Sequence, residues 1–239
     1  MAAAGIKEKQ SKTGDGSSAS GERVLEQKQP GLYTVIWHPI GGQPRPETLA
    51  ALGELMQTID GTELRLAPDE TAYIINLTGA EAEKILEATK ETAQTKFETS
   101  VSCIGASICQ VGARDSQALL QACVKAVGEA QIPDGALPQI HISGCPSSCG
   151  THQTGPMGFR GGVRMADGKA QPAFVFYLGG NEVQGKETMG RELGTMFESE
   201  IPSVLVKLGK EIAARGLDFE SYRTQYPDGI EKAAAEYLA

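Results

Sequence analysis

Apolar residues recur along the first half of the chain with two periods, which predict alternating strands and helices. Short runs of β-branched and aromatic residues predict strands, and apolar residues spaced three and four apart predict helices. Pro68-Asp69 lies between two of the predicted strands and indicates a turn. The elements expected are strands at 32–37, 62–66 and 72–77, a helix that begins at Pro46, and a helix at 79–92 that Thr78 can cap. This β-α-β-β-α order is a ferredoxin-like pattern.

The second half continues the alternation with longer apolar segments. A loop at 131–138 is marked by Pro133, Gly135 and Pro138. The elements expected are strands at 96–102 and 139–143, a helix that begins at Asp115 or Ser116, a hairpin of 161–165 with 173–178, and helices at 189–197, 201–215, 219–226 and 230–238. The predicted fold class is therefore α+β, with a ferredoxin-like half-domain at 24–95 followed by a mixed α/β domain at 96–239.

Composition limits the partners and the compartment. Residues 1–23 are small and polar, and they predict a disordered tail or a linker. The formal net charge of −8 makes nucleic acid a poor candidate partner. The sequence contains no run of about 18 apolar residues, so no membrane span is predicted. The N-terminus lacks the apolar core of a secretory signal. A cytoplasmic, reducing location is the natural expectation.

Four cysteines form the clearest chemical pattern in the sequence. Cys103 and Cys109 are separated by five residues, and Cys145 and Cys149 by three. Each pair follows a predicted strand, where loops tend to carry function. Four thiolates are the usual ligands of a cubane iron–sulfur cluster, and the small residues between Cys103 and Cys109 leave room for sulfide. Pro146 suits a helical turn that would bring Cys145 and Cys149 to one side.

Three other interpretations of these cysteines remain open. Disulfides are rare in reducing compartments. Structural zinc prefers cysteines spaced more closely than five residues apart. Four ordinary buried cysteines would not be expected in such a grouping. Cys123 is the contrasting case, because it lies on the apolar face of a predicted helix and is expected in the core.

The cysteine array resembles that of the sirohaem-dependent nitrite and sulfite reductases. That family carries a CX5C…CX3C array whose second half is similar to GCPSSC at 144–149. GFRGG at 158–162 and FYLGGN at 176–181 resemble a later turn and a strand end of the family, and GLYTVIWHPIGG at 31–42 resembles the start of its ferredoxin-like half-domain. The resemblance runs from about Val24 to near the C-terminus and covers what is the second half of the family's pseudo-duplicated enzymes.

The resemblance implies a [4Fe–4S] cluster on Cys103, Cys109, Cys145 and Cys149, with Cys149 also the axial ligand of sirohaem iron. Asn181 and Arg160 become candidate sirohaem contacts, whereas no catalytic residue is assigned. The implied reaction is the six-electron reduction of nitrite or sulfite, and the resemblance does not decide between the two anions. The implied partners are an electron donor, such as ferredoxin or a reduced nicotinamide-linked carrier, and a chain that supplies the first half.

The sequence departs from the family at two points. Ser147 stands where the family most often has Asn, and the half that carries most of the family's anion-binding basic residues is absent. A non-catalytic electron-transfer or assembly subunit is therefore the alternative function, and a zinc-stabilised binding module is a third.

Among the other polar residues, His38 and His141 are expected to be structural. His152 is a candidate neighbour of the cofactor, and Arg164 can bind carboxylates or remain exposed.

Overall fold

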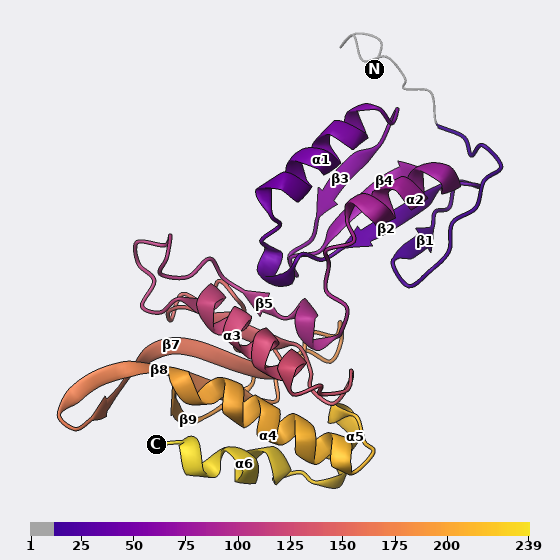
Figure 1. Ribbon diagram of the computed structural model, residues 1–239. Coiled ribbons are helices and arrows are strands. Elements are labelled where there is room, and N and C mark those ends of the chain that lie inside the picture. Colours follow the sequence, from indigo (N-terminus) through magenta and orange to yellow (C-terminus); the bar gives the residue numbers. More distant parts are fainter. Residues whose placement is uncertain (1–11) are drawn as a thin grey trace. The chain divides into compact units, whose positions relative to one another are not determined.

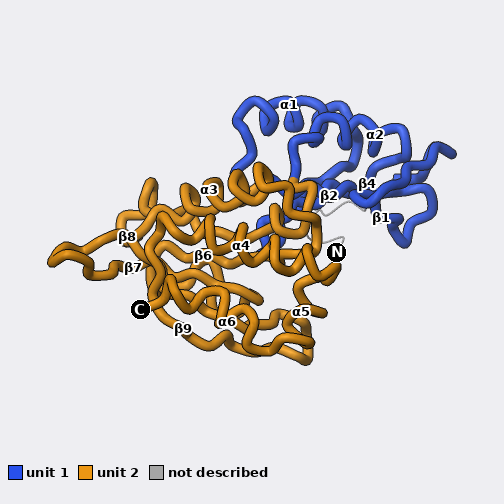
Figure 2. Tube along the Cα trace, turned by 60° about the horizontal axis from the view of Figure 1, so that its bottom comes forward, with its two compact units in different colours: residues 1–39, 43–92 blue, residues 40–42, 93–239 orange. Residues whose placement is uncertain are grey.

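The predicted strands form two separate sheets in the computed structural model, which describes residues 12–239. The described chain divides into two compact units (Figure 2). Unit 1 comprises residues 12–39 and 43–92, and unit 2 comprises residues 40–42 and 93–239. Each unit has its own hydrophobic core.

Unit 1 is a four-stranded antiparallel sheet in the order β1-β2-β4-β3, with two helices that pack together (Figure 1). Helix α2 is stabilised by a capping box, in which the Thr78 hydroxyl accepts from Glu81 N–H and the Glu81 carboxylate accepts from Thr78 N–H. The predicted β-α-β-β-α order is present, and β1 precedes it. The elements are β1 (Val24–Glu26), β2 (Tyr33–Trp37), α1 (Pro46–Gln57), β3 (Glu63–Leu66), β4 (Ala72–Leu77) and α2 (Gly79–Ala88).

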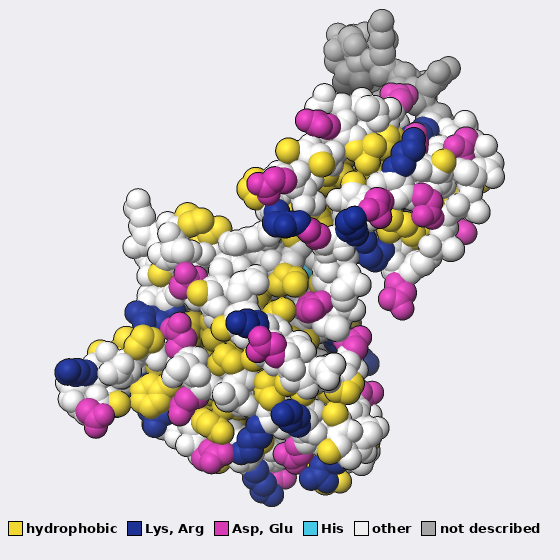
Figure 3. Space-filling model, in the orientation of Figure 1, with side chains coloured by type: hydrophobic (Ala, Val, Ile, Leu, Met, Phe, Trp, Pro, Cys, Tyr) yellow, Lys and Arg dark blue, Asp and Glu magenta, His cyan; other side chains and the backbone are white. Residues whose placement is uncertain are grey.

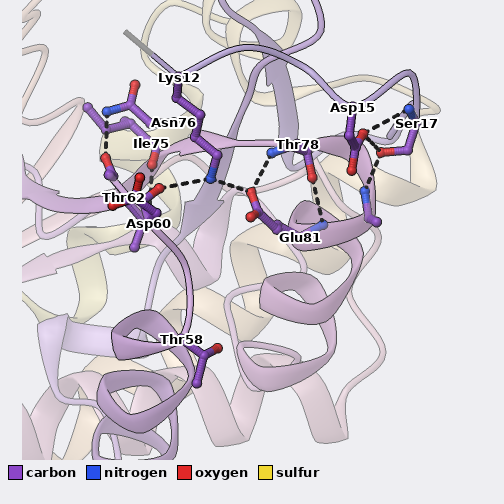
Figure 4. Close-up of polar contacts among 12 residues, drawn as sticks. Lys12, Asp15, Ser17, Thr58, Asp60, Thr62, Ile75, Asn76, Thr78 and Glu81 are labelled. Atoms are coloured by element: carbon purple, nitrogen blue, oxygen red, sulfur yellow. Dashed lines mark hydrogen bonds and ion pairs between the residues drawn. The ribbon is translucent and has the colours of Figure 1, made fainter. Parts of the chain in front are cut away.

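Within unit 1, the segment before β1 packs onto the rest of the unit from residue 12 onward (Figure 4). Lys12 Nζ lies 2.6 Å from the Glu81 carboxylate and 3.0 Å from the Asp60 carbonyl oxygen. The Ser17 hydroxyl accepts a hydrogen bond of 2.8 Å from Ala80 N–H, and Ala19 is buried in the core. A disordered tail or a linker was predicted at 1–23, and side chains of its described part find partners that the composition did not reveal. Residues 1–11 lie outside the described chain.

Unit 2 is a five-stranded mixed sheet in the order β5-β6-β7-β8-β9. Strands β5, β6 and β7 are parallel, whereas β8 and β9 are antiparallel to their neighbours. Helices α3 and α4 pack against each other over the core (Figure 1). The elements are η3 (Phe97–Thr99), β5 (Val101–Ser102), α3 (Ser116–Glu129), β6 (Ile140–Ser143), β7 (Met157–Ala166), β8 (Lys169–Leu178), β9 (Arg191–Phe197), η4 (Glu198–Glu200), α4 (Ile201–Ala214), α5 (Phe219–Gln225), α6 (Gly229–Ala234) and η5 (Ala235–Tyr237); the short turn η2 (Ile40–Gly42) also belongs to this unit.

The core of unit 2 lies on the helix-covered face of the sheet. Phe159 and Phe176 stack with their ring centroids 5.2 Å apart. Cys123 is fully buried in this core, as expected, and burial raises the pKa of its thiol. No helix within residues 12–239 is both long and apolar enough to cross a bilayer.

Candidate functional site

The two cysteine pairs follow neighbouring parallel strands. Cys103 comes directly after β5, and Cys145 comes two residues after the end of β6. Ser102 pairs with Ile142 in the register of these strands. The carboxyl ends of parallel strands meet at one edge of a sheet. The first cysteine loop, which carries Cys103 and Cys109, and the second cysteine loop, which carries Cys145 and Cys149, therefore begin at the same edge.

Cys103 is in direct contact with the second cysteine loop. Gly144 N–H, which immediately precedes Cys145, lies 3.1 Å from Cys103 Sγ. The Ser116 hydroxyl at the start of α3 also lies 3.1 Å from that sulfur. The Cys103 N–H donates to the Ile142 carbonyl at 3.0 Å, which continues the parallel pairing into the loop. The sulfur of Cys103 therefore contacts the residue that immediately precedes Cys145.

Backbone hydrogen bonds join the two loops further. Ala113 N–H and Arg114 N–H both donate to the Gly144 carbonyl, at 3.0 and 2.8 Å. A Cβ at Gly144 would lie 2.5 Å from the Arg114 carbonyl oxygen, and one at Gly150 would lie 2.0 Å from the Ile142 carbonyl oxygen. Only glycine permits these close approaches. Gly144 thus allows the two cysteine loops to pack against each other, and Gly150 allows the second loop to pack closely on β6.

The remaining cysteines lie on turns within these loops. Cys109 N–H donates to the Gly105 carbonyl at 2.8 Å, so the first pair spans a tight turn. Residues 145–149 also form a turn and not the helical turn that Pro146 suggested. Hydrogen bonds from the Ser147 hydroxyl and N–H lower the pKa of the Cys145 thiol, which favours the thiolate that binds metals. Cys149 is exposed, whereas Cys103, Cys109 and Cys145 are half-buried.

The donor chemistry fits an iron–sulfur cluster. All four cysteines are free thiols, and two hydrogen-bond donor groups lie at Cys103 Sγ. Among the described residues, no three His, Cys, Asp or Glu side chains converge as they would around a single metal ion.

Arg160 lies on β7, where it pairs with Ser143 of β6. Its guanidinium lies 3.7 Å from the Glu192 carboxylate and over the ring of Tyr177, and the Tyr177 hydroxyl donates to Glu192 at 2.9 Å. The Arg160 Nε is buried and has no hydrogen-bond partner within the described chain. Arg160 therefore has one unsatisfied donor in addition to its acidic partner.

Two further candidates have structural contacts of their own. The Asn181 side-chain oxygen accepts from Val183 N–H at 2.8 Å, and its backbone pairs with Thr188, so Asn181 holds a turn. Arg164 donates to the Tyr237 carbonyl at 2.9 Å and stacks over the Phe197 ring, so it is neither fully exposed nor directed at the cysteines. The role of Asn181 toward sirohaem stays a prediction.

The three histidines are all buried. His38 Nδ1 lies 2.9 Å from the Thr71 hydroxyl, and His141 Nδ1 lies 2.7 Å from the Thr151 hydroxyl; burial lowers the pKa of both rings. His152 is 0% exposed and packs against Tyr177, and neither ring nitrogen has a partner within the described chain. Burial, and then the charge of Arg160, lowers the pKa of His152 to about 4, so its ring is neutral at pH 7.

Ser116 is the site residue that sequence reasoning missed. The sequence identified it only as a possible first residue of a helix, a role that the structure confirms. Its contact with Cys103 spans 13 residues and depends on how α3 is placed against β5. No local pattern in the sequence indicates that contact.

Comparison with known proteins gives relatives that are named as nitrite reductases and as a sulfite reductase. The chain is 28% identical over 186 residues to a ferredoxin–nitrite reductase of Leptolyngbya laminosa, covering 75% of this chain and 35% of the relative. It is 27% identical to the ferredoxin–nitrite reductase of Synechococcus elongatus, covering 77% and 37%, and 24% identical to a sulfite reductase [ferredoxin] of Mycolicibacterium paratuberculosis, covering 63% and 29%. The chain thus spans about a third of the length of these relatives. No protein-family model matches the sequence.

Solved structures show the same fold. The NirA protein of Mycobacterium tuberculosis superposes with a TM-score of 0.69 at 20% identity, covering 92% of this chain and 41% of that one. A dissimilatory sulfite reductase, DsrI, superposes with a TM-score of 0.51 at 10% identity and covers 81% of this chain. The mixed arrangement of strands and helices in both units is therefore a known architecture.

Proposed function

We propose that this chain belongs to the nitrite/sulfite reductase family and that it uses a [4Fe–4S] cluster and sirohaem to reduce nitrite or sulfite. Cys103, Cys109, Cys145 and Cys149 would hold the cluster. The observation that carries this proposal is the contact of Cys103 Sγ with Gly144 N–H at 3.1 Å, since it brings the two cysteine pairs to one edge of the sheet.

Cys149 is exposed, which supports a second role in which it would also hold the iron of sirohaem. When bound, the cluster supplies single electrons, and sirohaem supplies the iron at which the anion is reduced. Arg160 has a buried and unsatisfied Nε that could donate to a sirohaem carboxylate. Asn181 is proposed as a further contact on the basis of the family resemblance alone.

Ferredoxin is the proposed electron donor, because the relatives are named for it. A carrier of this kind would dock by its surface charge. On the face shown in Figure 3, Lys and Arg side chains are interspersed with Asp and Glu over each unit, so that face offers no single basic patch. A reducing compartment such as the cytoplasm would keep the thiols free.

The alternative candidate is a cluster-binding electron-transfer or assembly subunit that works with another chain. The match covers only 35% and 37% of the first two relatives. A partner chain would then supply the remaining part of the sirohaem pocket and the groups that bind the anion.

Anaerobic reconstitution with iron and sulfide tests the cluster directly. We expect about four irons and four sulfides per chain, with a broad visible absorbance that dithionite bleaches. The Cys123→Ala variant is the matched control, because this cysteine is buried in the core and should leave the iron content unchanged. A protein that takes up zinc and no sulfide would instead be a zinc-stabilised module.

Addition of sirohaem separates the two candidate functions. The reconstituted chain is assayed alone with a reduced dye and either nitrite or sulfite. Turnover with a sirohaem absorbance band supports the enzyme and rejects the subunit. A stable cluster with neither the band nor turnover rejects the enzyme and favours the subunit.

A further inference from the structure

The sulfur of Cys103 lies between two hydrogen-bond donor groups from different elements. One is Gly144 N–H of the second cysteine loop, and the other is the Ser116 hydroxyl at the first residue of α3; both lie 3.1 Å from Sγ. The amide can donate only along its fixed backbone direction. The hydroxyl can rotate, so it can change its acceptor.

Ser116 has two acceptors within reach and one proton. Its Oγ lies 2.8 Å from the Cys103 carbonyl oxygen as well as 3.1 Å from Cys103 Sγ. While the cysteine is a thiol, S–H can donate to Oγ and the Ser116 hydroxyl can donate to the carbonyl. A sulfur bound to iron carries no proton and is only an acceptor, so the Ser116 proton can turn toward it. The carbonyl then keeps a donor, because the Ser102 hydroxyl lies 3.2 Å away.

The surroundings of Ser116 fix this geometry. Ser116 is 0% exposed, and the Asp115 carboxylate caps α3 by accepting from Ala118 N–H at 3.0 Å. A Cβ at Gly105 would lie 2.7 Å from Ser116 N and 2.9 Å from its Oγ, so the first cysteine loop packs directly on this residue. Water therefore does not compete with the Ser116 hydroxyl for the sulfur of Cys103. A buried hydrogen bond to a charged sulfur stabilises that charge strongly.

We infer that Ser116 sets the reduction potential of the cluster by donating a hydrogen bond to Cys103 Sγ. This inference rests on the proposed function, since it requires the cluster. The step concerned adds one electron and no proton, and a reduced ferredoxin-like carrier supplies the electron. The added negative charge is shared by the sulfurs, so Ser116 and Gly144 N–H stabilise the reduced form more than the oxidised form. Ser116 is a positioning residue and does not touch the substrate.

The test compares the midpoint potentials of reconstituted wild type, Ser116→Ala, Ser116→Thr and Ser107→Ala. Ser107 is the matched control, because it lies in the loop between Cys103 and Cys109 and its hydroxyl donates to the Ile104 carbonyl. Iron content is measured first, and each potential is then found by dithionite titration followed by electron paramagnetic resonance. We expect a more negative midpoint for Ser116→Ala and midpoints close to wild type for Ser116→Thr and Ser107→Ala.

Failure of the inference differs from failure of the proposed function. Wild type without iron and sulfide overturns the function. Wild type with about four irons and a Ser116→Ala protein of equal potential overturns only the inference. Ser116→Ala can fold, as judged by circular dichroism, and yet hold no iron. In that case an iron-loaded Ser116→Thr protein with the wild-type potential supports the role of the hydroxyl, and an iron-free Ser116→Thr protein rejects that role. If Ser116→Ala does not fold, Ser116→Thr is judged by the same two results.

Discussion

At the scale of single residues, the five cysteines divide by their surroundings. Cys123 is sealed in the core of unit 2, whereas the other four lie on loops with free thiols. Replacing Cys145 by Ser removes a thiolate and leaves a much weaker ligand, so we expect the reconstituted Cys145→Ser protein to lose most of its iron. Inductively coupled plasma analysis of iron and sulfur checks this outcome. Retention of about four irons by Cys145→Ser would remove Cys145 from the ligand set.

A second prediction at this scale concerns His152. Its folded-state pKa of about 4 lies below the ordinary value of 6.5, so the unfolded chain binds more protons between these two values. Stability therefore falls as the pH falls from 6.5 to 4, by up to about 1.4 kcal/mol per pH unit for one such group. Above pH 6.5 the ring is neutral in both states and its titration has no effect.

Urea unfolding of the chain at pH 4.5, 5.5 and 6.5 measures this effect. His152→Gln replaces the ring by a side chain that does not titrate, so its stability should fall less steeply over this range. The slope is the readout, since the substitution also alters packing. His38 and His141 titrate in the same direction and keep part of the slope in both proteins. Parallel curves for wild type and His152→Gln would mean that His152 is not buried in its neutral form.

At the scale of elements, the junction of the two cysteine loops depends on a glycine. A Cβ at Gly144 would lie 2.5 Å from the Arg114 carbonyl oxygen, so Gly144→Ala must push the loops apart. We expect a loss of about 1–3 kcal/mol in stability and a lower iron content, measured by urea unfolding and by metal analysis. Gly162→Ala is the control, because no atom lies within 4 Å of its added Cβ. Equal losses in both variants would contradict a special role for the junction.

The same scale shows how far the sequence predicts the fold. Helices α1, α3 and α4 and strands β4 and β6 lie close to their expected positions, because periodic apolar positions define them locally. A proline in the first turn marks the start of α1 and α4, and the Asp115 cap marks the start of α3. Residues 189–197 were predicted as a helix, and this was wrong, since 191–197 form β9. Leu193, Met196 and Phe197 have the spacing of a helix, and a bulge at Leu193 interrupts the alternation that would have indicated a strand.

Strand β5 also differs from its prediction. A strand was expected over 96–102, but only Val101–Ser102 pair with β6, and residues 97–99 form a 3-10 turn with Phe97 in the core. The cysteine loops were nevertheless correctly predicted to follow strands. What the sequence could not provide is the pairing of β5 with β6 and the placement of α3, which decide that Ser116 and Gly144 meet at Cys103. Those contacts depend on long-range packing and have no local signal.

At the scale of the whole molecule, the described chain has two cores, and all four loop cysteines belong to unit 2. The sequence contains a single tryptophan, Trp37, which is buried in the core of unit 1 and donates to the Glu91 carbonyl at 3.0 Å. Tryptophan fluorescence therefore reports the unfolding of unit 1, whereas cluster absorbance reports unit 2.

This division predicts how metal removal acts on stability. A bound cluster stabilises only the unit that holds it, since a ligand stabilises the folded state to which it binds. Chelating the iron should lower the transition temperature of unit 2 and leave that of unit 1 unchanged. Far-ultraviolet circular dichroism follows both units, and Trp37 fluorescence identifies the transition of unit 1. Cys145→Ser protein is the control, and its two transitions should not respond to iron. A Trp37 transition that moves with the iron content would show that the two units unfold as one cooperative body.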